Sequence, residues 1–166
     1  MAFRQAAREP EKYELDWGER FTALPWTEDR TEEIAAFLLS TGEESFTCVE
    51  ECADGTAESA RRYVTRAREH MQGKPDADVG YEASSLVYET ARNRLVAICL
   101  CCGPSLYLIE VHPEFQRQGL GTTMLKRALT VYAEHGVERF DLWRDDDSVG
   151  AALYERLGFR LTGEVE

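Results

Sequence analysis

The sequence has no excess of basic residues: 19 lysines and arginines stand against 31 aspartates and glutamates, a formal net charge of -12. Nucleic acid is therefore not an expected partner, because its phosphates would meet a repulsive field. The same field mildly favours cationic substrates such as amines. No run approaches the roughly eighteen apolar residues that a membrane span requires, so no membrane partner is expected.

Cysteines are few and odd in number, five in 166 residues. A disulfide framework is not expected, and a reducing cytoplasm is the default location. Residues 1–20 are charged throughout and lack the apolar region of a secretory signal. The three histidines are scattered, and the aspartates at 145–147 lack the alternating spacing of a calcium loop. No metal site is therefore predicted.

The composition is that of a globular protein, with 43% apolar and 10% aromatic residues in a length that suits one domain. We predict an N-terminal arm over residues 1–20 and one domain over residues 21–166. Apolar spacing and turn residues predict strands over 21–26, 85–90, 95–101, 106–111, 137–143 and 159–165, and helices starting near 31, 56, 120 and 149. Residues 73–80 are predicted to be a loop. The order β-α-α-β-β-β-α-β-α-β predicts an α/β (α+β) fold, a single mixed central sheet with helices on both faces.

The stretch between the strand that ends at Val111 and the helix that begins at Leu120 predicts an anion site, which we call the cradle (residues 116–123). Its two glycines carry no Cβ, so backbone N–H groups can approach a phosphate at the positive end of a helix dipole. A charge from an arginine and the hydroxyls of two threonines can add to this. The predicted ligand-binding residues are Val111, Gln116, Arg117, Gln118, Gly119, Leu120, Gly121, Thr122 and Thr123.

Two other phosphate-binding motifs do not fit the cradle. A P-loop requires a lysine after its last glycine, where this chain has Thr122. The dinucleotide fingerprint requires a third glycine three residues further on, where this chain has Met124. The phosphate therefore belongs to a different class of ligand.

Two motifs and the order of elements resemble the GNAT superfamily of N-acetyltransferases. The family's Q/R-x-x-G-x-G/A is matched by Gln116 to Gly121, and its C-terminal L-Y-x-x-x-G-F is matched by Leu153 to Phe159. Residues 106–160 resemble the family closely, and residues 21–105 resemble it in element order. The nearest likeness is to ribosomal-protein N-terminal acetyltransferases and their relatives. The resemblance implies the acyl-CoA N-acyltransferase (GNAT) fold.

The resemblance also implies acetyl-CoA as the acyl donor, with its pyrophosphate on the cradle, and direct attack by a primary amine in a ternary complex. The amine could belong to a small molecule, a polyamine or a protein N-terminus. The family often has an asparagine that contacts the cofactor at the start of the last helix, and Asp147 stands there, with Asp146 as the competing register. A non-catalytic acyl-CoA-binding or regulatory module is the alternative function, and an α/β domain unrelated to CoA is a third.

Tyr154 matches the position of the family's general acid. A phenol can supply the proton that the expelled CoA thiolate needs. For the general base we expect Glu110, a carboxylate in an otherwise apolar strand, because burial there would raise its pKa toward neutrality. Asp141, Glu89 or a water relay are the open alternatives.

The family's last helix is commonly followed by two strands, and one strand fits after Phe159. The second strand is then absent, supplied by residues 1–20, or supplied by a second chain. A homodimer would cover an exposed sheet edge.

Overall fold

One central sheet organises the computed structural model, which describes residues 3–41, 56–146 and 149–165. The sheet holds seven strands of this described part of the chain, in the order β2-β3-β4-β5-β6-β1-β7. Neighbours are antiparallel except β5 and β6, which are parallel, so the sheet is mixed, as the sequence predicts. The strands are β1 Phe3–Arg8, β2 Phe21–Leu24, β3 Ser85–Glu89, β4 Arg94–Cys102, β5 Ser105–Val111, β6 Phe140–Asp145 and β7 Arg160–Val165.

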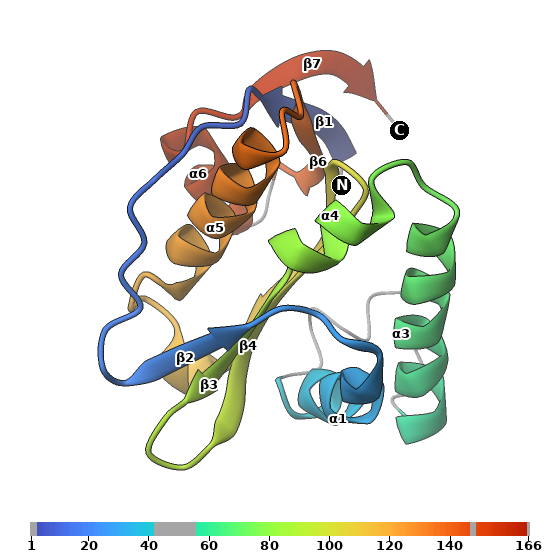
Figure 1. The fold of residues 1–166 in the computed structure, drawn as a ribbon, viewed down its shortest axis with the longest axis vertical. Coiled ribbons are helices and arrows are strands. Elements are labelled where there is room, and N and C mark those ends of the chain that lie inside the picture. The colour runs from blue at the N-terminus through green and yellow to red at the C-terminus, as the bar shows by residue number, and fades with distance from the viewer. Residues whose placement is uncertain (1–2, 42–55, 147–148, 166) are drawn as a thin grey trace.

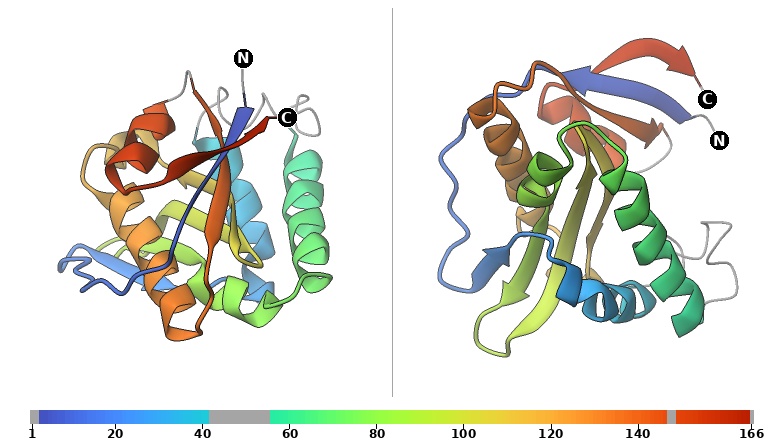
Figure 2. Two further views of the ribbon diagram at one scale, coloured as in Figure 1. Left: turned by 90° about the horizontal axis from the view of Figure 1, so that it is seen from above. Right: turned by 45° about the vertical axis from the view of Figure 1, so that its right-hand side comes forward.

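Helices cover both faces of this sheet (Figures 1 and 2). α1 and α3 pack on one face with Ile98 and Leu100 of β4, and α5 packs on the other with Ala97, Cys99 and Cys101 of the same strand. This alternation along β4 divides the apolar core into two layers. No helix of the described residues is long and apolar enough to cross a membrane. The helices are α1 Thr31–Ser40, α3 Ala57–Gln72, α4 Ala77–Ala83, α5 Leu120–Glu134 and α6 Val149–Arg156, with short 3-10 helices η1 Glu28–Arg30 and η3 Pro113–Phe115.

From residue 21 onward, the predicted strands and helices are present in the predicted order, and one helix that was not predicted, α4, lies between α3 and β3. The apolar face expected of the first helix is buried in α1 through Ile34, Phe37 and Leu38. α3 begins after Thr56, whose Oγ1 accepts a hydrogen bond from the Ser59 N–H at 3.2 Å. This side-chain cap satisfies one of the N–H groups that a helix start leaves without a partner.

Two boundaries differ from the prediction. A helix, α4, occupies part of the loop predicted over residues 73–80, and it follows Asp76, whose φ of 61° turns the chain. A Cβ on Gly80 would lie 3.1 Å from the Gly103 backbone nitrogen, so the missing side chain lets α4 approach the end of β4. β6 begins at Phe140 because the Val137 N–H still donates to the Tyr132 carbonyl at the end of α5.

The N-terminal segment contributes β1, which lies between β6 and β7 and pairs antiparallel with both (Figure 1). One of the open alternatives was that residues 1–20 supply a strand at this end of the sheet, and the structure places Phe3–Arg8 there. Ala6 is fully buried between the two neighbours. β1 therefore joins the final strand to the rest of the sheet.

Candidate active site

The turn between β5 and α5 brings free backbone donors together. Gly119 caps α5 with a left-handed φ of 83°, and Arg117, two residues earlier, has φ 63°. A Cβ on Gly119 would have nothing within 4 Å, so the space around it is open. Because a helix leaves its first N–H groups without intrahelical partners, those of Leu120, Gly121 and Thr122 point out of its N-terminus. This end of α5 is suited to an anion.

The side chains of the cradle are mostly engaged elsewhere. Gln116 Nε2 donates to the Val111 carbonyl at 3.1 Å, and Gln118 Oε1 accepts from Arg20 at 3.0 Å. Thr123 Oγ1 donates to the Gly119 carbonyl at 2.9 Å, so its proton is not offered to an anion. The Leu120 side chain is buried in the core, and those of Gln116, Arg117 and Gln118 are exposed. Backbone N–H groups are thus the main donors of the cradle.

The strand that leads to the cradle separates from its neighbour. β5 pairs with β4 along most of its length but with β6 at one register position, Ser105 opposite Asp141. There the Ser105 hydroxyl donates to Asp141 at 2.6 Å, and the Asp141 N–H donates to the Pro104 carbonyl at 3.1 Å. Ser105 begins β5 and Val111 ends it. Within the described ranges, β6 pairs with β5 only at the Ser105–Asp141 clamp, so the two strands separate from there toward the cradle.

Tyr154 lies on α6 and is 7% exposed. Its ring packs edge-on against Phe159 with centroids 6.1 Å apart. Burial, helped by the Cys99 thiol and the negative charge of Glu110, raises the pKa of Tyr154 to about 12. The hydroxyl is therefore close enough to β4 and β5 to feel a group on each, and it carries its proton at neutral pH.

The three carboxylates considered as bases lie in different places. Glu110 is half-buried on β5, within electrostatic reach of Tyr154. Asp141 holds Ser105 at the clamp between β5 and β6. Glu89 lies at the end of the β3–β4 hairpin, 3.6 Å from the guanidinium of Arg92 and 3.9 Å from that of Arg20. Only Glu110 of these three is among the groups that shift the pKa of Tyr154.

Two glycines leave space for side chains of α6. A Cβ on Gly121 would lie 3.3 Å from Leu153 Cδ2, so this glycine of the cradle also lets α6 pack against α5. A Cβ on Gly150 would lie 3.4 Å from the Tyr154 hydroxyl oxygen. Sequence reasoning did not single out Gly150, although its i, i+4 spacing to Tyr154 on a helix was a usable signal.

Arg144 fastens α6 to β6. This side chain is 5% exposed, and it forms ion pairs with Asp146 at 2.8 Å and with Glu155 at 3.0 Å. Arg4 of β1 also pairs with Asp146. Because Glu155 follows Tyr154 directly, this network helps to fix the orientation of the helix that carries the phenol. Asp147, the predicted cofactor contact, lies outside the described residues.

The cysteines of β4 do not resemble reactive thiols or metal ligands. Cys99, Cys101 and Cys102 are buried. A hydrogen bond with Cys101, together with burial, raises the pKa of Cys99 well above its usual range, and burial raises that of Cys102 to about 12. The described residues contain no group of three or more histidine, cysteine or acidic side chains that could hold a metal ion.

Known proteins share this sequence pattern and fold. The sequence profile of the Acetyltransferase (GNAT) family matches residues 3–159. The ribosomal protein bS18 alanine N-acetyltransferase of Escherichia coli K12 is 40% identical over 58 residues, which are 33% of this chain and 38% of that enzyme. The similarity therefore spans well under half the length of this curated relative.

Solved structures agree in fold. A GCN5-related N-acetyltransferase from Sphaerobacter thermophilus superposes with a TM-score of 0.64 at 18% identity, over 97% of this chain and 48% of that one. The protein PH1933 from Pyrococcus horikoshii OT3 gives 0.61 at 16% identity, over 87% and 91%. At these identities the structures support the fold alone. The profile, which spans nearly the whole sequence, shows more: this chain belongs to the GNAT family of acetyltransferases.

Proposed function

We propose that this protein transfers the acetyl group of acetyl-CoA to a primary amine, by direct attack of the amine in a ternary complex. The observation that carries the proposal is the separation of β5 from β6, which pair at Ser105 alone in the part of the chain that the structure describes, with the cradle at the end of β5 and Glu110 within electrostatic reach of Tyr154. A donor with a phosphate at one end and a thioester at the other fits this arrangement.

The donor would be held mainly by backbone groups. The N–H groups of Leu120, Gly121 and Thr122 would receive the pyrophosphate. The side of β5 that separates from β6 would offer main-chain N–H and C=O groups to the amide-containing arm that follows, as a strand edge does to an added strand. The exposed guanidinium of Arg117 would add positive charge at the rim.

The reaction moves two protons. A primary amine is mostly protonated at neutral pH and must lose a proton before it attacks. Glu110, directly or through a water, would accept that proton. The nitrogen then bonds to the acetyl carbon, and the carbon–sulfur bond breaks. The CoA sulfur leaves as a thiolate and takes up one proton, while the new amide nitrogen gives one up.

Tyr154 is suited to stabilise the sulfur as charge develops on it. Its pKa of about 12 keeps the phenol protonated, whereas a thiol has an ordinary pKa of about 8.5. Complete transfer from the phenol to the thiolate would be uphill by roughly 5 kcal/mol, at about 1.4 kcal/mol per pKa unit. We infer that Tyr154 acts through a hydrogen bond to the leaving sulfur, and that a proton released from the amine makes the transfer complete.

Direct attack is favoured over an acetyl-cysteine intermediate. A covalent route needs a thiolate, because the thiolate is the nucleophile. Cys99, the thiol that influences Tyr154, is fully buried, and its pKa is raised well above the usual range. It therefore stays a thiol at neutral pH.

The test is release of CoA thiol from acetyl-CoA with a panel of primary amines, using the wild type and Tyr154→Phe. We expect turnover by the wild type and a loss of about 10²-fold or more in the variant, the size usual when one hydrogen-bond donor to the developing charge is removed. CoA should still raise the melting temperature of the variant, because the cradle is intact. Unchanged turnover in Tyr154→Phe would refute the role of the phenol. CoA binding without thiol release from any amine would instead favour the non-catalytic module.

A further inference from the structure

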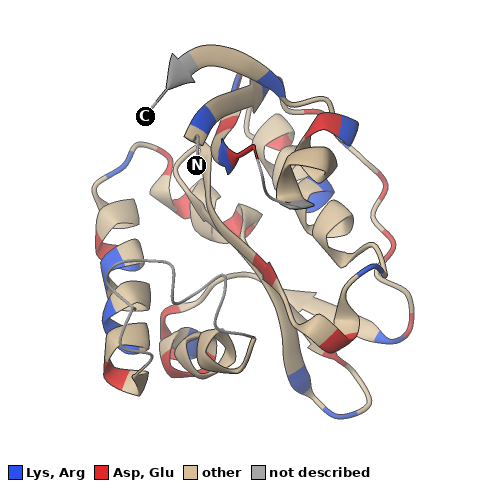
Figure 3. Ribbon diagram, turned by 180° about the vertical axis from the view of Figure 1, so that it is seen from behind, with Lys and Arg blue, Asp and Glu red and all other residues tan. Residues whose placement is uncertain are grey.

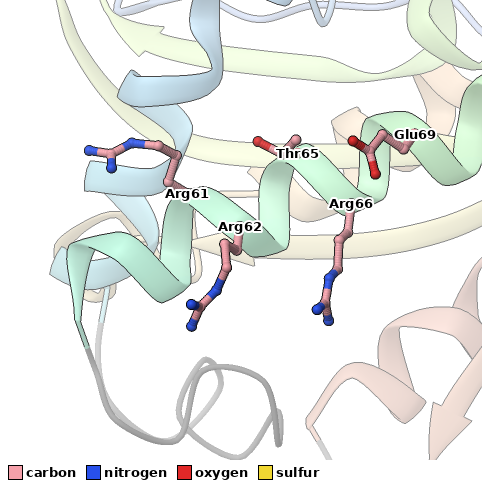
Figure 4. A pocket seen from close by; sticks show the side chains of 5 residues that line it. All are labelled: Arg61, Arg62, Thr65, Arg66 and Glu69. Carbon is pink, nitrogen blue, oxygen red and sulfur yellow. The ribbon is translucent and has the colours of Figure 1, made fainter.

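Two arginines next to α6 are buried far more deeply than the arginines of α3. Three side chains of α3 line a shallow surface depression with Thr65 and Glu69 (Figure 4): Arg61, Arg62 and Arg66. Of these, Arg61 and Arg62 are 50% and 57% exposed. The side chains of Arg8 and Arg144 are 15% and 5% exposed. Charged side chains are seldom buried so deeply unless they are paired, so the partners of these two arginines indicate what they hold in place.

The loop that leads into α6 is held by two arginines from neighbouring strands. Arg4 of β1 lies directly opposite Arg144 of β6, and both pair with Asp146, three residues before α6 begins. Figure 3 shows basic and acidic positions side by side at this end of the sheet, near the N-terminus. Like charges directly opposite each other on adjacent strands repel. The carboxylate of Asp146 offsets that repulsion and fixes the loop to β1 as well as to β6.

The other end of α6 is capped by a second side chain of β1. Arg8 Nη1 donates to the Leu157 carbonyl and, at 2.9 Å, to the Tyr13 hydroxyl. The last carbonyls of a helix have no partner within the helix, and the helix dipole favours a cation beside them. In the same turn the Phe159 N–H donates to the Tyr154 carbonyl at 3.0 Å. Arg8 therefore completes a cap that includes the backbone of Tyr154.

The guanidinium of Arg8 is itself held in place. Its Nη2 donates to Glu11 at 2.8 Å, and its Nε donates to the Glu9 carbonyl at 3.0 Å. The Tyr13 N–H donates in turn to the Thr130 hydroxyl of α5 at 3.0 Å. Each nitrogen of the Arg8 guanidinium thus has an acceptor, so the donor to the end of α6 has a fixed direction and is linked to α5.

The spacing of the two arginines on β1 matches the length of α6. Residues four apart on a strand lie on the same face, about 13 Å from one another. The eight residues of α6 extend over about 12 Å. Ala6 lies between Arg4 and Arg8 on that face and is fully buried in the core cluster that contains Tyr154 and Leu157. One strand can therefore contact the loop before α6, its middle and its end.

We propose that Arg4 and Arg8 are positioning residues, through which β1 holds both ends of α6 and sets the place of the Tyr154 hydroxyl. The inference rests on the proposed role of Tyr154 as a hydrogen-bond donor to the leaving sulfur. It extends the reaction machinery to a strand that lies outside both sequence motifs. Neither arginine is expected to touch the donor or the amine, since each acts through the helix.

The first test follows the phenol itself, so it does not depend on turnover. An isotope label at the tyrosine Cζ gives an NMR signal for each tyrosine, and the signal missing from Tyr154→Phe identifies Tyr154. In Arg8→Ala the pKa read from this signal should fall from about 12 toward the ordinary value of 10, because the hydroxyl loses part of its burial. Arg8→Lys, which keeps a cation and a donor, should restore most of the wild-type value.

The matched control is Gln5→Ala. Gln5 belongs to the same strand, and its side chain accepts hydrogen bonds from Arg139 at 2.8 Å and Thr162 at 3.1 Å, on the face of β1 opposite Arg4 and Arg8. Loss of these bonds changes the attachment of β1 to the sheet without touching α6. The Tyr154 signal should therefore titrate in Gln5→Ala as it does in the wild type.

The second readout is the rate of thiol release. Arg8→Ala should lower kcat on the order of tenfold, while its affinity for CoA, measured by calorimetry, stays unchanged because the cradle is intact. In a Tyr154→Phe background Arg8→Ala should cause no further loss, because Arg8 acts through the phenol. Arg4→Ala should give the same pattern with a smaller loss, since Arg144 still holds Asp146. This second variant tests the inference even if Arg8→Ala does not fold.

Three outcomes would overturn the inference. The first is an unchanged Tyr154 signal in both Arg8→Ala and Arg4→Ala, and the second is an equal change in Gln5→Ala, which would make β1 only a part of the sheet. The third is a rate loss that persists at full size in the Tyr154→Phe background. Failure of the proposed function is distinguishable from all three: the wild type would release no thiol with any amine, while the Tyr154 signal would still respond to Arg8→Ala.

Discussion

Gly150 leaves room beside the hydroxyl of Tyr154, one helical turn further along α6. A Cβ at position 150 would lie 3.4 Å from the hydroxyl oxygen and 3.4 Å from Cε2 of the same ring. These are contact distances without a clash, so a methyl group would fit and would cover one side of the phenol. A substitution at Gly150 can therefore distinguish an effect on stability from an effect on catalysis, because an alanine there would favour the helix and obstruct the Tyr154 hydroxyl.

Gly150→Ala should therefore stabilise the protein and slow it. Alanine in a helix is favoured over glycine by up to about 1 kcal/mol, which urea unfolding can measure. Thiol release should fall by roughly tenfold, because small displacements at a reacting group cost rate steeply. In a Tyr154→Phe background the same substitution should have no further effect on rate, which a double-mutant cycle checks. An additive loss in both backgrounds would show that Gly150 acts elsewhere.

Glu110→Gln should lower kcat/KM at neutral pH by roughly 10²-fold, the size usual for a general base. The deficit should shrink as the pH approaches the pKa of the acceptor amine, because more of the amine is then free without help. A pH profile of thiol release measures this.

The matched variants for that experiment are Asp141→Asn and Glu89→Gln. An asparagine can still accept the hydrogen bond from Ser105, and Glu89 lies with Arg20 and Arg92. Both variants should retain the wild-type profile. A profile altered by Asp141→Asn but not by Glu110→Gln would transfer the role to the clamp.

Local sequence signals predict much of this fold because its elements are strongly periodic. The buried faces of α1 and α3 follow from spacing alone, and the hairpin of β3 and β4 follows from two apolar runs around a polar turn. β1 could not be found in this way. Within its sequence Phe-Arg-Gln-Ala-Ala-Arg only Ala6 is buried, and the strand depends on partners more than 130 residues away, in β6 and β7.

The candidate site likewise has a part that local sequence predicts and a part that depends on distant residues. The cradle is local, and the two glycines with the helix start predict its shape. Which side chains are used is not local: Thr123 donates to its own helix, and Gln118 accepts from Arg20, 98 residues away. The proximity of Glu110 to Tyr154 depends on how α6 packs across β5. From sequence, Glu110 was one carboxylate among three.

Gly119→Ala and Gly136→Ala form a matched pair at the two ends of α5. Both glycines have positive φ, 83° and 72°, and a Cβ on either would have nothing within 4 Å. Each substitution should cost roughly 1–2 kcal/mol of backbone strain and nothing in contacts. Gly119→Ala alone should also weaken CoA binding, measured by calorimetry, because the strain is relieved by moving the N–H groups of the cradle. Equal CoA affinity in the two variants would place the anion elsewhere.

Tyr154 should make the protein sensitive to alkaline pH. Its folded pKa of about 12 lies above the ordinary value of 10, so the phenol stabilises the fold fully below pH 10, and this contribution is lost as the pH rises toward 12. Between pH 9 and pH 11 a pKa shift of about two units corresponds to a loss of roughly 1.4 kcal/mol in the free energy of unfolding.

Tyr154→Phe has no phenolic proton at position 154 to lose over this interval. Its free energy of unfolding should fall by about that much less than the wild type's over this interval, measured by urea unfolding at both pH values. Tyr88, whose pKa burial also raises to about 12, is present in both proteins and cancels in the comparison. If the two proteins lose the same stability, the phenol is not held in the buried environment on which its role as a hydrogen-bond donor to sulfur depends.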